Sequence, residues 1–308
     1  MRTIAVLCGG VGAARFLAGL VDATDPAGIM AIVNVADDDE FHGLHVSPDI
    51  DTVLYTLAGV VEESQGWGRR DETFHAQEEL ARFGEPAWFR LGDRDLAAHL
   101  HRTRLLREGR PLTEVVDGMR RALGIQATIL PATDGTQRTL VRTDAGWLAF
   151  QDYFVRRRAA DRVHEVRFDP DAVPTALVRA AIAEADIVVI APSNPFVSIG
   201  PILALAGMRE AVAARRDRVV AVSPIVGGAA IKGPAAAMLA ALGHEVSALG
   251  VARMYADVAS AFVIDEQDAA LRPAIEALGL RVSVTATVML DARSRENLAR
   301  ATVAAIAA

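Results

Sequence analysis

The chain has 308 residues, of which 52% are apolar and 23% charged, so it can bury a sizeable core and is not globally disordered. Lys and Arg number 32 against 39 Asp and Glu, and the net charge of −7 argues against general binding to nucleic acid or to anionic membranes. The single cysteine, Cys8, excludes an internal disulfide and a thiolate zinc cage. These features, with no apolar run long enough to span a membrane, predict a cytoplasmic protein.

The chain opens with a β-α-β pattern. Residues 3–8 are mostly apolar, as in a strand covered on both faces, and the glycine-rich turn 9–12 follows. Residues 13–21 have helical apolar spacing, and residues 28–35 form a second apolar run. Such a unit is right-handed in nearly all proteins.

Strands alternate with helices again in the second half. Strands are predicted at 186–191, 218–222, 261–264 and 281–285, and helices at 199–214, 232–242, 268–278 and 294–307. This alternation predicts an α/β fold with a doubly wound, mainly parallel, Rossmann-like sheet.

The middle of the chain, residues 62–168, has a different pattern. Helices are predicted at 73–82, 95–106 and 113–123, followed by short β segments at 139–142, 146–150 and 163–168. We interpret this region as a mostly helical, partly antiparallel insertion with soft boundaries. No linker separates it, so residues 1–308 are predicted to form a single α/β domain.

The first glycine turn is a candidate phosphate site. Gly9, Gly10 and Gly12 allow backbone amides to approach an anion at a helix N-terminus. The alternative is a tight turn needed only for packing. The turn lacks the Gly-Lys-Ser/Thr of a P-loop and the third small residue of a dinucleotide fingerprint, which disfavours a nicotinamide oxidoreductase without excluding one.

Aspartates follow the second strand at high density. Asp37, Asp49 and Asp51 are the candidate metal ligands, because hard carboxylate oxygens suit Mg²⁺. Ser47 and Pro48 are typical of a helix start, so Asp49 and Asp51 are expected in its first turn. The alternative is that they only complement the helix dipole.

A third cluster combines aromatic and charged residues. Trp88, Arg90, Asp93 and Arg94 surround a glycine, in a pattern that positions guanidinium groups for phosphate oxygens and rings for stacking on a heterocycle. The alternative is a surface turn with a satisfied ion pair.

Polar loops follow two strands of the second half, where α/β sheets bind ligands. The first loop carries Ser193 and Asn194, and the second carries Ser223, Gly227, Gly228 and Lys232. The repetition of a polar loop after successive strands predicts a nucleotide or phosphate site. No H-E-x-x-H or G-x-S-x-G motif is present, so zinc hydrolase and serine hydrolase chemistry are disfavoured.

Taken together, these segments resemble one known family. The matching segments are residues 9–12, Asn34 with 37–38, 47–52, 66–68, 73–74, 90–95, 191–195 and 223–228. They are similar to the 2-phospho-L-lactate transferase (phosphoenolpyruvate transferase) family of coenzyme F420 biosynthesis, nearly from end to end.

The resemblance implies a reaction. Such enzymes transfer a phosphoenolpyruvyl or 2-phospho-L-lactyl group from a GDP-linked donor to the hydroxyl of 7,8-didemethyl-8-hydroxy-5-deazariboflavin, with Mg²⁺, and release GMP. It implies that Asp51 and Arg90 contact the deazaflavin, with Asp49 beside them in catalysis. Trp88, Asp93 and Arg94 are then further candidates for binding the substrate.

Three questions stay open at this point. The donor is enolpyruvyl or lactyl, with enolpyruvyl favoured by resemblance, and a homodimer is the expected assembly. The alternative function is a non-catalytic regulator that binds nucleotide sugars, similar to the gluconeogenesis-factor family.

Overall fold

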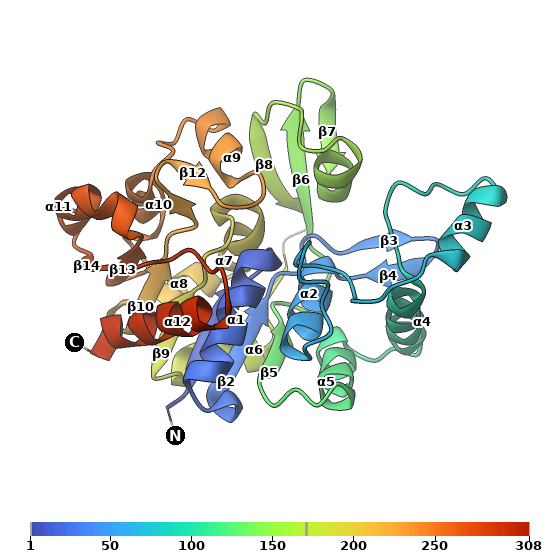
Figure 1. The fold of residues 1–308 in the computed structure, drawn as a ribbon, viewed down its shortest axis with the longest axis horizontal. Helices are drawn as coiled ribbons and strands as arrows, with labels where there is room; N and C mark the ends of the chain where they lie inside the picture. The colour runs from blue at the N-terminus through green and yellow to red at the C-terminus, as the bar shows by residue number, and fades with distance from the viewer. Residues whose placement is uncertain (1, 170–171, 308) are drawn as a thin grey trace.

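A seven-stranded sheet forms the centre of the computed structural model, which describes residues 2–169 and 172–307 (Figure 1). Its order is β14-β13-β10-β9-β1-β2-β5, and every neighbouring pair is parallel. The strands are β1 (Ile4–Cys8), β2 (Ile29–Val33), β5 (Thr128–Pro131), β9 (Ile187–Ile190), β10 (Val219–Val222), β13 (Ala261–Ile264) and β14 (Arg281–Val284). The predicted fold class is confirmed.

Helices cover both faces of this sheet. One face is covered by α1 (Gly10–Ala23), α2 (Pro48–Leu57), α5 (Leu112–Ala122) and α12 (Ala292–Ala307). The other is covered by α6 (Ala176–Glu184), α7 (Gly200–Ala204), α8 (Met208–Ala213), α10 (Ala248–Tyr255) and α11 (Arg272–Glu276). Strand β1 explains the two cores: Ala5 and Leu7 point into one and Ile4, Val6 and Cys8 into the other, as period-2 alternation requires.

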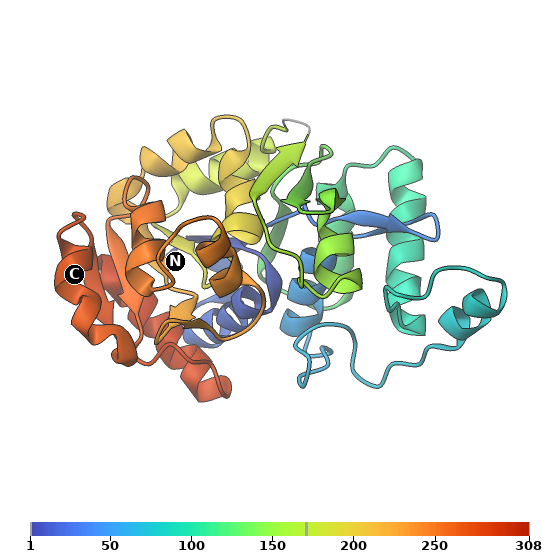
Figure 2. The same cartoon turned by 90° about the horizontal axis from the view of Figure 1, so that it is seen from above.

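Smaller units surround the central layers. An antiparallel sheet of β6 (Arg138–Thr143), β7 (Gly146–Ala149) and β8 (Glu165–Asp169) stands beyond the carboxyl edge of the main sheet, together with α9 (Ala235–Ala241) (Figure 1). The hairpins are β3 (Asp39–Phe41) with β4 (Leu44–Val46), and β11 (Ile225–Val226) with β12 (Ala229–Ala230). Helices α3 (His75–Arg82) and α4 (Asp93–Arg107) form an arm beside β3 and β4 (Figure 2).

Several elements differ from the sequence predictions. The helix expected at 199–214 is interrupted between α7 and α8, because Gly207 adopts a left-handed φ of 72°. The hairpin β3–β4 was not predicted, since its turn is His42-Gly43 rather than the usual Asn-Gly or Asp-Gly. Helices α6 and α10 and strand β5 were also missed. Strand β5 lies within residues 62–168, yet it pairs with β2 and so belongs to the main sheet. The interpretation of residues 62–168 as an insertion stays a prediction.

The strand order defines where a ligand is expected to bind. From β1, the chain proceeds to β2 and β5 on one side and to β9, β10, β13 and β14 on the other. The crevice between the carboxyl ends of β1 and β9 is therefore a topological switch point, at which open α/β sheets bind ligands. The loops that follow β1 and β9 carry the predicted glycines and Asn194.

The buried position of Cys8 gives a first prediction. Its side chain is fully buried at the end of β1, and burial, with the nearby Asp49 carboxylate, raises the pKa of the thiol well above its usual value. Because alkylation needs an accessible thiolate, the folded protein is expected to react with iodoacetamide slower than the denatured protein by about a thousandfold or more. Mass spectrometry of labelled protein checks this, with Cys8→Ala as the blank. Equal rates with and without denaturant would contradict it.

Candidate active site

Asp49 is held at the start of α1, at the carboxyl end of β1. Its Oδ1 accepts a hydrogen bond of 2.8 Å from the backbone N–H of Gly10, and its Oδ2 accepts one of 2.9 Å from Nδ2 of Asn34. Asp49 lies in the first turn of α2, after Pro48, as the sequence predicted. The contact therefore joins the ends of β1 and β2 to the beginning of α2.

Asn34 extends this contact to the loop that follows β9. Its Nδ2 also donates to the carbonyl oxygen of Val197, at 3.2 Å, and its Oδ1 accepts from the N–H of Ala36, at 3.0 Å. Asn34 is buried, and Val197 lies in the π-helical segment Pro195–Ile199. One amide side chain thus connects both sides of the switch point.

The predicted glycines make this close approach possible. A Cβ on Gly9 would lie 2.5 Å from Oδ2 of Asp49 and 2.9 Å from Cβ of Ser198. A Cβ on Gly12 would lie 2.5 Å from the carbonyl oxygen of Pro192. Only glycine fits at these two positions without displacing backbone or packed side chains. The glycine turn is thus tightly packed against Asp49 and the β9 loop, and its role in phosphate binding stays a prediction.

Asp37 and Asp49 form an acidic pair in this region. Burial raises the pKa of Asp37 well above its usual value, and the Asp49 carboxylate raises it further. Burial also raises the pKa of Asp49 to about 6, against the lowering effect of the hydrogen bonds from Asn34 and Gly10. The Asp38 carboxylate raises the pKa of Asp49 as well, so burial and neighbouring carboxylates disfavour the ionised form of both groups, a cost that a bound cation would offset.

Asp51 has a different environment. Both of its oxygens accept hydrogen bonds from the guanidinium group of Arg102 in α4, one of them at 3.1 Å from Nη1. Arg102 is fully buried and Asp51 nearly so. Burial lowers the pKa of Arg102, but Asp51 outweighs this effect and the pKa is raised overall. Among the predicted metal ligands, Asp51 therefore already has a protein cation, whereas Asp37 and Asp49 do not share it.

The aromatic cluster lies on the arm formed by α3, α4 and the β3–β4 hairpin. The rings of Phe41 and Phe89 stack at 4.0 Å between centroids, and Trp88 meets both rings edge-on. The guanidinium of Arg90 lies 4.0 Å from the centre of the Phe74 ring. Trp88 and Arg90 thus belong to a partly exposed aromatic surface, with no hydrogen bond between them and Asp49.

Asp93 and Arg94 have structural partners. The carboxylate of Asp93 accepts hydrogen bonds from Thr73 and from the backbone N–H groups of His75 and Ala76, at 2.7 to 3.1 Å, and so caps α3. In return, Glu72 accepts from the backbone N–H of Arg94 at 2.8 Å, at the start of α4. The two helices cap each other, and neither predicted side chain needs a ligand to explain its position.

The remaining predicted residues lie at the carboxyl edges of later strands. Asn194 caps the segment Pro195–Ile199 through a 2.9 Å bond from the N–H of Phe196. The buried hydroxyl of Ser193 has no hydrogen-bond partner among the residues that the structure describes. Ser223 bonds within its own turn, to both backbone groups of Ile225. The structure therefore places Ser193 at the switch point with an unused donor.

The second loop reaches back towards α1. Gly227 and Gly228 form the turn between β11 and β12, and the N–H of Gly227 donates to Asp268 at 3.1 Å. Lys232 donates to the carbonyl oxygen of Gln65 at 3.0 Å. Burial and the nearby Arg15 lower the pKa of Lys232. Arg15 was not among the residues predicted for the site. The only sequence signal for it was its position in the helix that follows the glycine turn.

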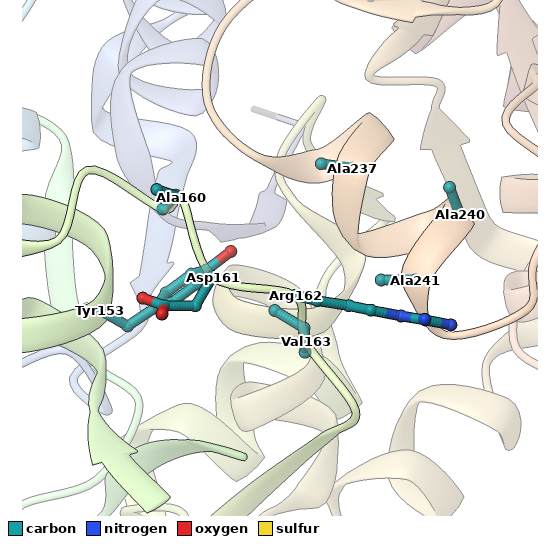
Figure 3. A pocket seen from close by; sticks show the side chains of 9 residues that line it. Tyr153, Ala160, Asp161, Arg162, Val163, Ala237, Ala240 and Ala241 are labelled. Carbon is teal, nitrogen blue, oxygen red and sulfur yellow. The ribbon is translucent and has the colours of Figure 1, made fainter. Parts of the chain in front are cut away.

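Two surface pockets lie away from the acidic centre formed by Asp37 and Asp49. The larger has a volume of about 430 Å³ and lies between α9 and residues 159–163 (Figure 3). Its wall consists of Tyr153, three alanines of α9 and the segment with Arg162. The smaller, about 310 Å³, lies along α4 and β4. Neither pocket includes a residue predicted for the site.

Residues 2–169 and 172–307 contain no group of three or more His, Cys, Asp or Glu side chains placed so that they could hold a metal ion. Helices long and apolar enough to cross a bilayer are likewise absent from this part of the chain.

Arg102 gives a prediction for stability. Arg102→Met leaves the Asp51 carboxylate buried without its partner, which is expected to lower the free energy of unfolding by about 3–5 kcal/mol. Arg104→Met is the matched control on the same helix, because its ion pair with Glu108 is exposed and contributes about 0–1 kcal/mol. Denaturant titration measures both values. Equal losses in the two variants would contradict the prediction.

Comparison with known proteins gives a consistent result. Residues 4–306 match the family described as 2-phospho-L-lactate transferase CofD. The phosphoenolpyruvate transferase of Streptomyces griseus is 44% identical over 96% of both chains, and that of Thermobifida fusca is 46% identical over 86% of this chain and 87% of its own. The 2-phospho-L-lactate transferase of Methanothermobacter thermautotrophicus is 41% identical over 96% of both chains.

The fold also has a solved counterpart. A crystal structure of a UPF0052 family member from Bacillus halodurans superposes with a TM-score of 0.66 over 98% of both chains, at 18% identity, which bears on the fold alone. The match across almost the whole sequence and the identities above 40% lead to one conclusion: the chain belongs to the 2-phospho-L-lactate transferase CofD family.

Proposed function

We propose that this chain transfers a phosphoenolpyruvyl group, or alternatively a 2-phospho-L-lactyl group, from a GDP-linked donor to the hydroxyl of 7,8-didemethyl-8-hydroxy-5-deazariboflavin in coenzyme F420 biosynthesis, releasing GMP. Family membership supports the reaction class, and two of the relatives above are named phosphoenolpyruvate transferases. The observation that carries the proposal is the buried Asp49, fixed between Gly10 and Asn34 at the switch point.

The reaction is a displacement at phosphorus. The acceptor hydroxyl forms a new O–P bond, the bond between this phosphorus and GMP breaks, and the hydroxyl proton is released. Such reactions depend on positioning and on neutralising charge in the transition state rather than on a covalent intermediate. The N–H groups at the start of α1, the Ser193 hydroxyl and Lys232 are the donors we assign to the phosphates and the guanosine.

The acidic pair fits a magnesium ion. Asp37 and Asp49 are buried, and the Asp49 carboxylate raises the pKa of Asp37, so a divalent cation would supply the missing positive charge. Mg²⁺ usually binds one or two carboxylates and takes its other ligands from water and substrate phosphates. We therefore assign the ion to Asp37 and Asp49, and Asp51 to the acceptor. When bound, Mg²⁺ neutralises charge on the phosphoryl oxygens.

The aromatic surface of the arm is assigned to the deazaflavin ring. The Trp88 ring, which meets Phe41 and Phe89 edge-on, is the ring we assign to stacking, and Arg90, fixed against Phe74, offers a charged donor to ring oxygens. Asp93 and Arg94 serve this site indirectly by fixing the loop through their capping contacts. We further propose that the protein acts as a cytoplasmic homodimer, and light scattering tests the assembly.

The Asp49 assignment has a direct test. Asp49→Asn is expected to lower turnover by about 100-fold or more, because it removes one of the two carboxylates assigned to the Mg²⁺ that would neutralise charge on the reacting phosphate. It is also expected to weaken Mg²⁺ binding in a calorimetric titration. Mass spectrometry of the product with each donor separately measures transfer and identifies the three-carbon unit.

Asp217→Asn is the matched control. Asp217 is exposed and precedes β10, at the edge of the sheet opposite the site. Wild-type turnover in Asp49→Asn would refute the assignment of Asp49. Wild-type protein that binds nucleotide but forms no product with either donor would favour the regulator instead.

Arg90 has a separate test, because it concerns the acceptor alone. Arg90→Ala is expected to weaken deazaflavin binding by about tenfold, the value of one hydrogen bond to a charged group, with the fold unchanged since the side chain is exposed. Titration of the deazaflavin fluorescence measures this. Arg82→Ala, an exposed arginine that pairs with Glu79 on α3, is the control. Equal affinities for both variants would remove Arg90 from the site.

A further inference from the structure

Arg102 joins several elements from inside the protein. Its guanidinium group binds both oxygens of Asp51 in α2, and its Nη1 lies 3.4 Å from the carbonyl oxygen of His45 in β4. It is fully buried and is the largest such side chain in the part of the chain that the structure describes. An arginine at this depth is held in one orientation, with the carboxylate that it binds.

The contact leaves part of Asp51 available. An ionised carboxylate has about four lone-pair positions, of which the two hydrogen bonds from Arg102 use two. The side chain of Asp51 keeps 8% of its surface exposed, whereas that of Arg102 keeps none. Asp51 can therefore accept a hydrogen bond from outside while Arg102 fixes it from behind.

We propose that Arg102 is a positioning residue that fixes the Asp51 carboxylate in the orientation in which it accepts a hydrogen bond from a hydroxyl of the acceptor. This inference rests on the proposed function, in which Asp51 contacts the deazaflavin riboside. Arg102 itself does not touch substrate, since it is covered on every side.

Surrounding groups support a rigid position. His99 is buried one turn earlier on α4, with its Nδ1 3.3 Å from Nη1 of Arg102 and 3.7 Å from Oδ2 of Asp51. Thr103, which follows Arg102 in the sequence, accepts a 2.8 Å hydrogen bond through its hydroxyl from the backbone N–H of His45. Helix α4 thus holds the β4 backbone beside Asp51 through two neighbouring side chains.

A purely structural role for Arg102 makes a different prediction from a positioning role. Loss of structure alone would lower stability and affect both substrates, whereas loss of the Asp51 orientation would affect the acceptor selectively. The experiment therefore compares binding of the deazaflavin, followed by its fluorescence, with binding of GDP, followed by calorimetry. The variants are Arg102→Lys, Arg102→Met, Asp51→Asn and the double variant Asp51→Asn with Arg102→Met.

The expected result is selective. Arg102→Met weakens deazaflavin binding by about tenfold or more while GDP binding stays within about twofold. Arg102→Lys recovers part of the affinity, because it restores the charge but not the paired hydrogen bonds. The double variant binds no more weakly than Asp51→Asn, since both changes remove the same contact.

Arg102→Met could fail to fold, because it leaves the Asp51 carboxylate buried without a partner. The double variant removes both charges and so avoids this problem. Deazaflavin binding by the double variant and by Arg102→Lys then still tests the inference. Arg104→Met is the matched control: it removes an exposed ion pair with Glu108 on the same helix but leaves the Asp51 ion pair, so deazaflavin affinity is expected to be retained.

Three outcomes would overturn the inference. They are deazaflavin affinity at the wild-type level in Arg102→Lys and Arg102→Met, an equal loss of deazaflavin and GDP affinity in Arg102→Met, and effects of the Asp51 and Arg102 changes that add in the double variant. Wild-type protein that does not bind the deazaflavin would instead refute the proposed function, and with it the role of Asp51.

Discussion

The hydrogen bonds that fix Asp49 hold the rest of the site together. A single carboxylate receives the N–H of Gly10 and the amide of Asn34, and Asn34 in turn binds Val197 beyond β9. Loops from three neighbouring strands and the first turn of α2 therefore meet within hydrogen-bond distance of one another. A buried carboxylate is stable only when hydrogen-bond donors compensate for its loss of water. The two donors to Asp49 follow the carboxyl ends of β1 and β2, so the same hydrogen bonds bring these strand ends together.

Charge is handled differently at the two aspartates of the α2 turn. Asp51 is paired with Arg102, whereas Asp37 and Asp49 form no salt bridge within the part of the chain that the structure describes, and burial raises the pKa of both. Two carboxylates on one helical turn thus have different partners: Asp51 binds a buried guanidinium group, whereas Asp49 accepts hydrogen bonds from Gly10 and Asn34. The proposed division between acceptor and metal follows from this difference.

Local sequence signals predicted the parts of the structure that depend on local physics. The apolar strands, the glycine turn and the Ser47-Pro48 helix start all appear where the sequence indicated, because burial periodicity and helix initiation are short-range properties. The partners of the predicted residues were not accessible in this way. Arg102 is 51 residues from Asp51, and Asp93 is 17 residues from Ala76, from whose N–H it accepts a hydrogen bond at the start of α3, so neither contact was visible as a motif. Strand β5 was missed because four residues in a region of different composition give little periodicity.

The place of β5 has a consequence for how this protein can be divided. Although it follows the arm in sequence, it completes the main sheet by pairing with β2 along Met30 to Val33. Excising the middle of the chain would thus uncover the backbone of β2 and create an open, apolar edge of the kind that recruits strands from other molecules. The arm of α3 and α4 is thereby tied to the main sheet by covalent continuity, and a shortened version of the protein would have to retain both.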